Sequence, residues 1–331
     1  MFAKTFEKFS YTSAGISTIF LLGISYYYTT LDITWSLFES KIINAILIFG
    51  ALMLSNYAID TVTRQLTIER STRNGYHLLL YPLIVMSYPI ESIDMRFILS
   101  SAAIWAAWRN MRIFFELTDN TKKIKRLFDA SILLAFSSLI IVENLIIFIY
   151  PLLALITSNI RKDFKHYVLI FMTPIIILPS AYVFLSFLSL DSYFFSSYFF
   201  ADQPIVTDEY NFIPNSSRFF LMLVDEYNFN LTYSYIPILI VFVLFVISVI
   251  IKFSRTYSSR RRILDVLGVL FIILTSLFFT MDQLSGSEFH YLSLPVVYMV
   301  SQIFAKKINS LYVNFIFIIL IVSTLTFNFL I

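Results

Sequence analysis

The chain contains no cysteine, and it has only six glycines in 331 residues. Without cysteine it can form no disulfide, no thiolate nucleophile and no cysteine-ligated zinc or iron–sulfur centre. Its three histidines, His77, His166 and His290, are far apart in sequence, so they predict no histidine-rich metal centre. The glycines form neither a G-x-G-x-x-G nor a P-loop pattern, and these loops are what hold nucleotide phosphates. We therefore expect no haem, iron–sulfur or nucleotide site.

Charge is also scarce. Charged residues make up 14% of the sequence, hydrophobic residues make up 58%, and the mean hydropathy is +0.79. A soluble globular protein has about 25% charged residues and less than half apolar residues. Because surface area grows quickly with chain size, this excess of apolar side chains does not fit inside one soluble core. The composition predicts an all-α, polytopic membrane protein, and it argues against a nucleic-acid binder or a secreted enzyme.

Eleven apolar segments are candidate transmembrane helices, because about 20 apolar residues cross the core of a bilayer. They are residues 12–30, 42–60, 75–90, 96–109, 128–142, 144–160, 166–189, 232–251, 263–281, 290–305 and 311–331. We expect the first to be retained, since no small-residue cleavage site accompanies Lys4 and Lys8. The third to fifth are short and the sixth follows the fifth closely. This fits either broken or re-entrant helices around a cavity, or plain tilted hairpins.

The charged residues test this count through the positive-inside rule. With the N-terminus in the cytoplasm, 21 of the 24 lysines and arginines fall in cytoplasmic turns, and 13 of the 21 acidic residues fall outside. The pattern predicts an N-in, C-out topology. One long outer loop, residues 190–231, then separates a seven-span module at 1–189 from a four-span module at 232–331.

Carboxylates gather near the membrane on the predicted outer side. Asp32 directly follows the first span, and Glu91 and Asp94 lie in the tight turn between the third and fourth spans. Carboxylates that converge beside a bilayer can act as a general base or as oxygen ligands for Mg²⁺ or Mn²⁺. The sequence therefore predicts Asp32, Glu91 and Asp94 as the catalytic residues, and as the metal ligands if a metal is bound.

Two arginines and the last outer turn complete the candidate site. Arg96 and Arg218 are the only outer arginines, and a guanidinium suits the phosphate of a lipid. Glu288 and His290 lie in the last outer turn, where they are candidates to exchange a proton. Each residue also has an ordinary interpretation. Arg96 pairs with a neighbouring carboxylate at a helix end, His290 is an interfacial histidine, and the carboxylates lie where the charge bias permits them.

A resemblance to known membrane proteins rests on three segments: Lys125–Leu139 (KRLFDASILLAFSSL), Tyr150–Leu155 (YPLLAL) and the hairpin Pro89–Arg112. Together they resemble an uncharacterised family of multi-pass inner-membrane proteins from Gram-negative bacteria. More remotely, they resemble the membrane half of the GT-C glycosyltransferases, which take sugars from polyprenyl-phosphate donors at the outer leaflet.

In the GT-C superfamily a catalytic carboxylate follows the first span, and a second acidic motif lies between the third and fourth spans. The resemblance assigns Asp32 to the first position and Glu91 with Asp94 to the second. The sequence departs from that pattern in its first outer loop, Leu31–Lys41, which is shorter than the loop of the family and holds no Asp-x-Asp.

These observations lead to one expected function and two alternatives. The resemblance implies a GT-C-like glycosyltransferase that uses a polyprenyl-phosphate-linked sugar at the periplasmic face of the bacterial inner membrane. The alternatives are a non-catalytic subunit or assembly factor of a cell-envelope complex, and a transporter of lipid or polysaccharide. The loop 190–231 holds Asp-Glu-Tyr-Asn-Phe twice, at 208–212 and 225–229, and it is the expected surface for protein partners. The other expected partners are membrane lipids, with no nucleic acid.

Overall fold

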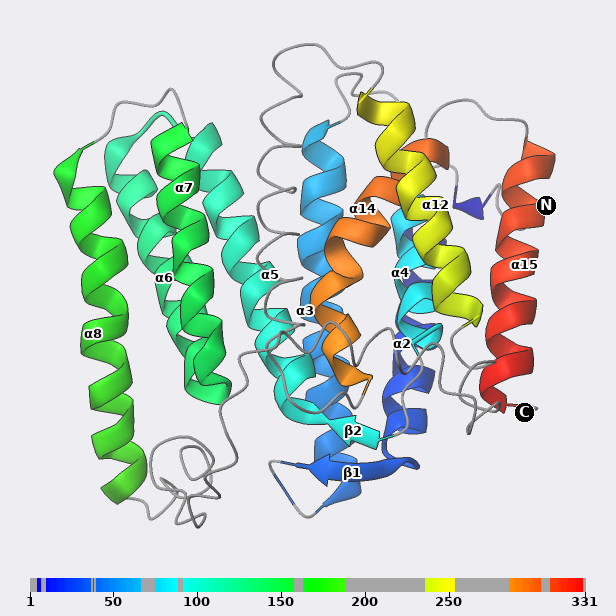
Figure 1. Ribbon diagram of the computed structural model, residues 1–331, viewed down its shortest axis with the longest axis horizontal. Coiled ribbons are helices and arrows are strands. Elements are labelled where there is room, and N and C mark those ends of the chain that lie inside the picture. The colour runs from blue at the N-terminus through cyan, green and yellow to red at the C-terminus, as the bar shows by residue number, and fades with distance from the viewer. Residues whose placement is uncertain are drawn as a thin grey trace, which may run out of the picture.

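The structure, a computed structural model, describes ten parts of the chain: residues 5–6, 10–36, 38, 40–66, 75–88, 92–157, 163–187, 236–253, 286–304 and 310–329. These residues are almost entirely helical, which confirms the predicted all-α fold class. Figure 1 shows the helices side by side, with their axes in broadly the same direction and two short strands at the lower edge of the view. Of the eleven predicted segments, 263–281 lies outside the described residues, and a helix covers most of each of the others.

The described helices follow the chain in a simple order, and η marks a 3₁₀-helix. They are α2 (Tyr11–Tyr28), α3 (Lys41–Leu66), α4 (Tyr76–Met86), α5 (Met95–Glu116), α6 (Asn120–Ile140), η1 (Val142–Phe148), α7 (Ile149–Thr157), α8 (Phe164–Phe187), α12 (Ile236–Phe253), η2 (Ser287–Leu292), α14 (Ser293–Phe304) and α15 (Ser310–Phe329).

Polar side chains define the first turns of three helices. The hydroxyl of Ser10 accepts a hydrogen bond from the backbone N–H of Ser13 at the start of α2 (3.1 Å). Asp94 and Asp119 each accept one from the backbone N–H two residues further on, at 2.9 Å, at the starts of α5 and α6. Such N-caps satisfy N–H groups that have no partner within the helix. Asp94 therefore has a structural role in addition to any chemical one.

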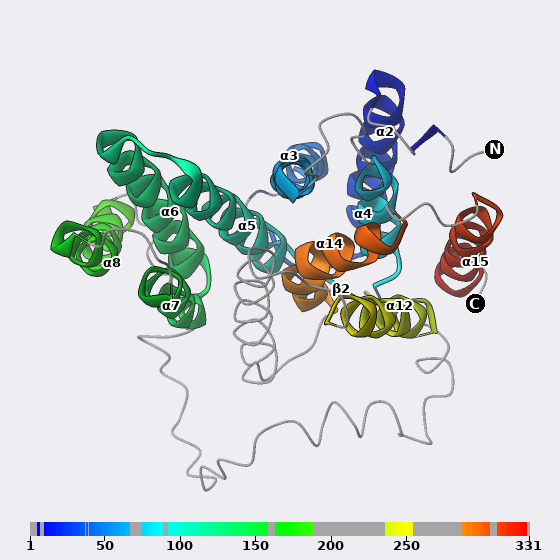
Figure 2. The ribbon, with the colours of Figure 1, turned by 90° about the horizontal axis from the view of Figure 1, so that it is seen from above.

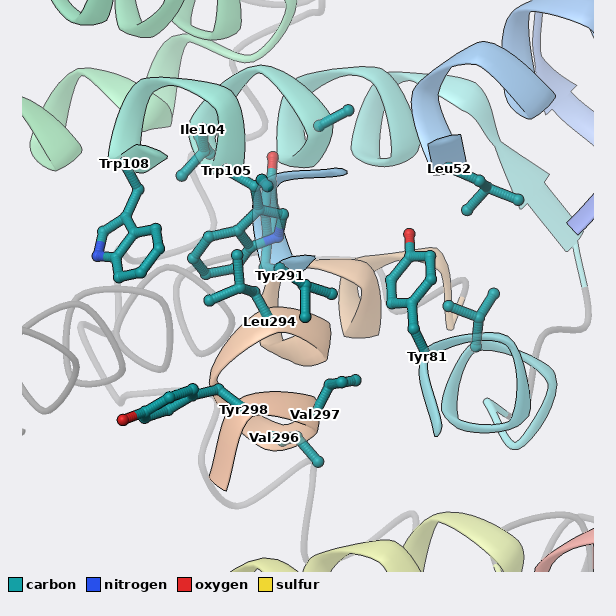
Figure 3. Packing of buried hydrophobic residues seen from close by; sticks show 14 of the residues in the cluster. Leu52, Tyr81, Ile104, Trp105, Trp108, Tyr291, Leu294, Val296, Val297 and Tyr298 are labelled. Carbon is teal, nitrogen blue, oxygen red and sulfur yellow. The ribbon is translucent and has the colours of Figure 1, made fainter. Parts of the chain in front are cut away.

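Helix α5 lies at the centre of the packed helices. Figure 2 shows it between α3 and α6. Small side chains between Ser100 and Ala107 let its neighbours approach closely, and most of the helix is buried. The buried indoles of Trp105 and Trp108 point from α5 towards Leu294 and Tyr298 of α14 (Figure 3). Helix α5 also packs against η2, directly before α14, so early and late parts of the sequence share one core.

A two-stranded parallel sheet is the one element that the sequence did not predict. Strand β1 (Asp32–Trp35) pairs with β2 (Ser92–Asp94), and the register places Asp32 opposite Ser92 and Trp35 opposite Asp94. Segments of three and four residues are too short to show an alternating pattern. Because β1 follows α2, β2 follows α4 and the strands are parallel, α2 and α4 reach the same end of the helices. We call this end, with β1, β2 and η2, the strand end.

The opposite end carries most of the described positive charge. Arg109 and Arg112 lie in the last two turns of α5, and the run Lys122–Arg126 lies in the first turns of α6. The side-chain amide of Asn120 donates a hydrogen bond to Asp163 (3.2 Å), which joins the start of α6 to the residue before α8. We call this the basic end.

Two helices in the described part of the chain are long and apolar enough to cross a membrane. They are the first 20 residues of α3, Lys41–Asp60, and the whole of α8, at 24 residues. This assessment rests on length and composition. Shorter apolar helices lie within α4, η1–α7, α12 and α15. The arrangement of about eleven spans stays a prediction.

Helix α5 is longer than the sequence predicted. The fourth candidate span ends at Arg109, but the helix continues to Glu116 and has 22 residues, or about 33 Å. The guanidinium of Arg109 donates to the hydroxyl of Tyr57 on α3 (3.0 Å) and lies 4.4 Å from the centre of its ring. The helix is longer than the predicted segment, and α5 is not one of the two described helices that are long and apolar enough to cross a membrane.

Candidate functional site

Three segments that are far apart in sequence meet at the strand end. Strands β1 and β2 pair, and η2 packs against β2 and α5. The backbone N–H of Asp94 donates to the hydroxyl of Ser287 in η2 (3.1 Å), which joins residues 193 positions apart. The segments that carry Asp32, Asp94, Glu288 and His290 therefore lie together at one end of the molecule.

Asp94 forms an ion pair with Arg96 in the first turn of α5. Nη2 of Arg96 lies 2.6 Å from Oδ2 of Asp94, and Nε donates to both carboxylate oxygens at 3.1 Å. The Asp94 side chain is 6% exposed, whereas that of Arg96 is 29% exposed. This is the ordinary interpretation that the sequence allowed for Arg96. The partial exposure still leaves the guanidinium accessible to an anionic group at the strand end.

A glycine turn carries Glu288 and His290 into the interior. Gly286 has a φ of 85°, a left-handed conformation that glycine adopts without strain. The residues that follow form η2, where Glu288 is 0% exposed and His290 is 1% exposed. The sequence placed both residues in an outer turn. The structure places both residues at the strand end and buries their side chains.

The imidazole of His290 lies among aromatic rings. Tyr88 and Tyr28 both meet it edge to face, with ring centres 5.3 Å and 5.9 Å away. Its Nε2 has no hydrogen-bond partner among the described residues. His290 lies in η2, before the first residue of α14. Burial disfavours the charged imidazolium and lowers the pKa of the ring to about 3. At pH 7 the ring is therefore neutral. It can accept a hydrogen bond, but it holds no second proton to give.

Polar contacts fix η2 against the neighbouring helices. The carbonyl of His290 accepts a hydrogen bond from the indole of Trp105 on α5 (3.4 Å). The hydroxyl of Tyr291 lies 2.5 Å from that of Ser100 on α5 and accepts from the amide of Asn144 in η1 (3.1 Å). Figure 3 shows the rings of Trp105 and Tyr291 close together under α5. Sequence reasoning missed this network, because its members are far apart in the chain and meet only through the packing of α5, η1 and η2.

Several predicted site residues stay predictions. Glu91 and Arg218 lie outside the described residues, as does the loop 190–231, and Asp32 is placed only by its backbone in β1. The described side chains include no group of three or more His, Asp or Glu residues that could hold a metal ion. Both carboxylate oxygens of Asp94 face the guanidinium of Arg96, so this arrangement does not offer Asp94 to Mg²⁺ or Mn²⁺.

The sequence analysis also missed a second ionisable pair, which lies away from the strand end. Asp60 on α3 and His77 on α4 approach to 3.3 Å between Oδ1 and Nε2, and their side chains are 8% and 1% exposed. A signal was present: a carboxylate ends one apolar segment, and a histidine lies near the start of the next. Only the packing of α3 on α4 shows that the two side chains meet.

No protein-family model, curated protein or solved structure matches this chain. Its function therefore has to be inferred from the residues at the strand end and from the character of the helices that carry them.

Proposed function

We propose that the chain is a multi-pass protein of the bacterial inner membrane that transfers a sugar from a polyprenyl-phosphate donor. Its active site would lie at the strand end, on the periplasmic side. The observation that carries the proposal is the meeting of β1, β2 and η2, which gathers the segments of four predicted site residues: Asp32, Asp94, Glu288 and His290.

Exposed apolar side chains support a position in the membrane. In the most apolar 18-residue stretch of α8, only 11% is buried inside the molecule. Large side chains such as Ile175, Val183 and Phe184 are more than half exposed. A soluble monomer rarely leaves so much contiguous apolar surface in water, whereas lipid tails would cover it without cost. Similar exposed side chains occur on α2, α3, α12 and α15.

The charges at the strand end suit a lipid-linked donor. A transferase must remove a proton from the acceptor hydroxyl while the bond from the sugar to the phosphate breaks. The carboxylate of Asp32 is our candidate base, by its position after the first helix. Arg96 would stabilise the charge that develops on the departing phosphate, since a guanidinium binds phosphate oxygens in pairs. Asp94 would hold Arg96 in place through the ion pair between them.

Neutral His290 and buried Glu288 fit a supporting role better than a role as the acid. The buried imidazole has no proton to give at pH 7, but its unpartnered Nε2 can accept a hydrogen bond from a substrate hydroxyl. Glu288 lies two residues before His290 on η2, fully buried. We therefore assign His290 to substrate orientation and Asp32 to proton removal.

Lipid binding by the full chain is the first test. The purified protein would be examined in mild detergent by native mass spectrometry, after addition of polyprenyl phosphate or of phosphatidylglycerol as the competing anionic lipid. The proposal expects one polyprenyl phosphate per chain, retained at detergent concentrations that remove phosphatidylglycerol. Arg96→Gln should weaken this binding at least tenfold. Arg126→Gln at the basic end is the matched control and should leave it unchanged.

Asp94→Asn separates the charge of Asp94 from its role as helix cap, because asparagine is an equally good N-cap. The transferase proposal expects this variant to fold normally and to lose the orientation of Arg96, so that polyprenyl phosphate binds more weakly. Equal binding of the two lipids, with Asp94→Asn and Arg96→Gln both indistinguishable from the parent chain, would overturn the proposal. A stable complex with another envelope protein that carries no polyprenyl lipid would favour the docking subunit instead.

A further inference from the structure

We propose that the outer face of α6 binds one anionic phospholipid at the basic end of the molecule. The lipid phosphate would contact Lys122 and Lys125, and an acyl chain would extend along Phe128 and Phe136 on the same helix. The proposal rests on the position in the membrane proposed above. It does not depend on the transferase, whose site would lie at the strand end.

Two lysines provide the positive charge for the headgroup. Lys122 and Lys125 lie three residues apart on α6, so they share one face of the helix. Both are exposed. Nζ of Lys122 lies 3.9 Å from Oδ2 of Asp119, and the Lys122 side chain is 71% exposed, so this contact is one that an external anion can compete for. The two ammonium groups can therefore reach one phosphate together.

The start of α6 has an excess of positive charge. From Asp119 to Asp129 the sequence holds four basic residues and two acidic ones. Asp129 lies 3.8 Å from Arg126, which also donates a hydrogen bond to Asn110 on α5 (3.2 Å). Arg126 therefore has partners within the protein, whereas the exposed lysines face outwards. A cluster of basic side chains beside an apolar helix attracts anionic lipid headgroups.

Apolar side chains continue the same face away from the basic end. Phe128 is 46% exposed and Phe136 is 50% exposed, and the partly exposed Ile132 lies between them. A spacing of four residues places the three side chains in one stripe along the helix. From Lys125 to Phe136 the helix rises about 16 Å, and one leaflet of a bilayer has a hydrocarbon depth of about 15 Å. The stripe therefore matches the length of an acyl chain below the headgroup.

The other faces of α6 are occupied by the protein itself. The helix packs against α5, η1 and α8, and side chains such as Leu127 and Leu134 are buried. Figure 2 shows α6 and α8 on the side of the molecule away from α12 and α15. On α8, Phe171 and Ile175 are more than half exposed. A molecule with an anionic head and apolar chains matches both the lysines and the apolar surface that continues from them.

Native mass spectrometry of the full chain in mild detergent tests this site. Phosphatidylglycerol and phosphatidylethanolamine with the same acyl chains would be titrated separately, because the two lipids differ in net headgroup charge. We expect the chain to retain one phosphatidylglycerol in preference to phosphatidylethanolamine. Lys125→Gln should weaken this binding about fivefold, the usual effect of one basic residue near an anionic lipid. Lys123→Gln is the matched control: it changes the net charge equally at a partly buried position on another face of α6, and should change binding less than twofold.

Further arms separate the proposed site from other sources of binding. Lys125→Arg keeps the charge and should bind phosphatidylglycerol like the parent chain, and soluble glycerol phosphate should not displace the lipid. Equal retention of the two phospholipids, or equal effects of Lys125→Gln and Lys123→Gln, would overturn the proposal, as would displacement by glycerol phosphate. Polyprenyl phosphate is measured in the same samples and should bind Lys125→Gln normally. The transferase proposal is tested by Arg96→Gln instead, so the two proposals fail by different results.

Discussion

Two of the acid–base pairs in the described part of the chain differ in what they join. Asp94 and Arg96 lie two residues apart in one helix turn, with Arg96 29% exposed. Asp60 and His77 join two helices, and both are buried. The first pair is the shorter, at 2.6 Å against 3.3 Å. The shorter distance nevertheless does not mean a larger contribution to stability. Water can replace a lost partner at the partly exposed strand end, but it cannot do so between the packed helices α3 and α4.

The largest expected effect is at the buried pair. His77→Ala should lower the free energy of unfolding by about 3–5 kcal/mol, because it leaves the Asp60 carboxylate buried without its imidazole partner. Denaturant unfolding in mixed micelles, followed by the fluorescence of the buried Trp105 and Trp108, measures this change.

The double variant Asp60→Leu with His77→Ala serves as the control for the lost charge. It removes both ionisable groups, and apolar replacement of a buried pair is often neutral, so much of the stability should return. If His77→Ala costs less than about 1 kcal/mol, the pair behaves like a surface pair, and the contrast between the two regions does not hold.

The second effect follows from the depressed pKa of His290. An unfolded histidine titrates near 6.5, whereas the pKa of buried His290 is about 3. Between these values the unfolded chain binds the proton and the folded chain does not, so stability falls as the pH falls below 6.5. From pH 6.5 to 5 this group should cost about 2 kcal/mol.

The comparison of the parent chain with His290→Gln isolates this contribution to the pH dependence. Glutamine cannot titrate, so the variant should lose less stability than the parent chain between pH 6.5 and 5. Parallel stability curves for the two proteins over this range would contradict the assignment of a buried, neutral imidazole to His290.

The sequence predicted the helices well and the contacts between them poorly. Apolar runs marked where helices lie, because long apolar segments have few alternatives. They placed the end of α5 too early, at Arg109, because the helix continues to Glu116. The outer position of Asp94 and His290 followed from charge bias, and the structure places both at the strand end. The meeting of Asp60 and His77, the burial of Glu288 and the short strands all depend on tertiary packing, which leaves no local pattern in the sequence.

A smaller effect is expected at the cap of α5. Asp94→Ala removes the acceptor for a backbone N–H in the first turn and should cost about 1 kcal/mol. Asp94→Asn keeps an acceptor for that N–H, so it should lower the free energy of unfolding by only a few tenths of a kcal/mol. The same unfolding assay compares them, and equal losses in the two variants would show that the charge matters here rather than the cap.

The smallest effect is expected for Arg96→Ala, at about 1 kcal/mol or less. Although the pair is short, Arg96 is partly exposed, and Asp94 keeps its backbone hydrogen bond as a cap. The loss should also shrink in high salt, since ions screen exposed charges, whereas the loss in His77→Ala should change little. Unfolding of both variants at low and high salt measures this contrast. A large, salt-independent loss in Arg96→Ala would mean that its guanidinium is enclosed in the folded protein, and the strand end would then resemble the interior site of Asp60 and His77.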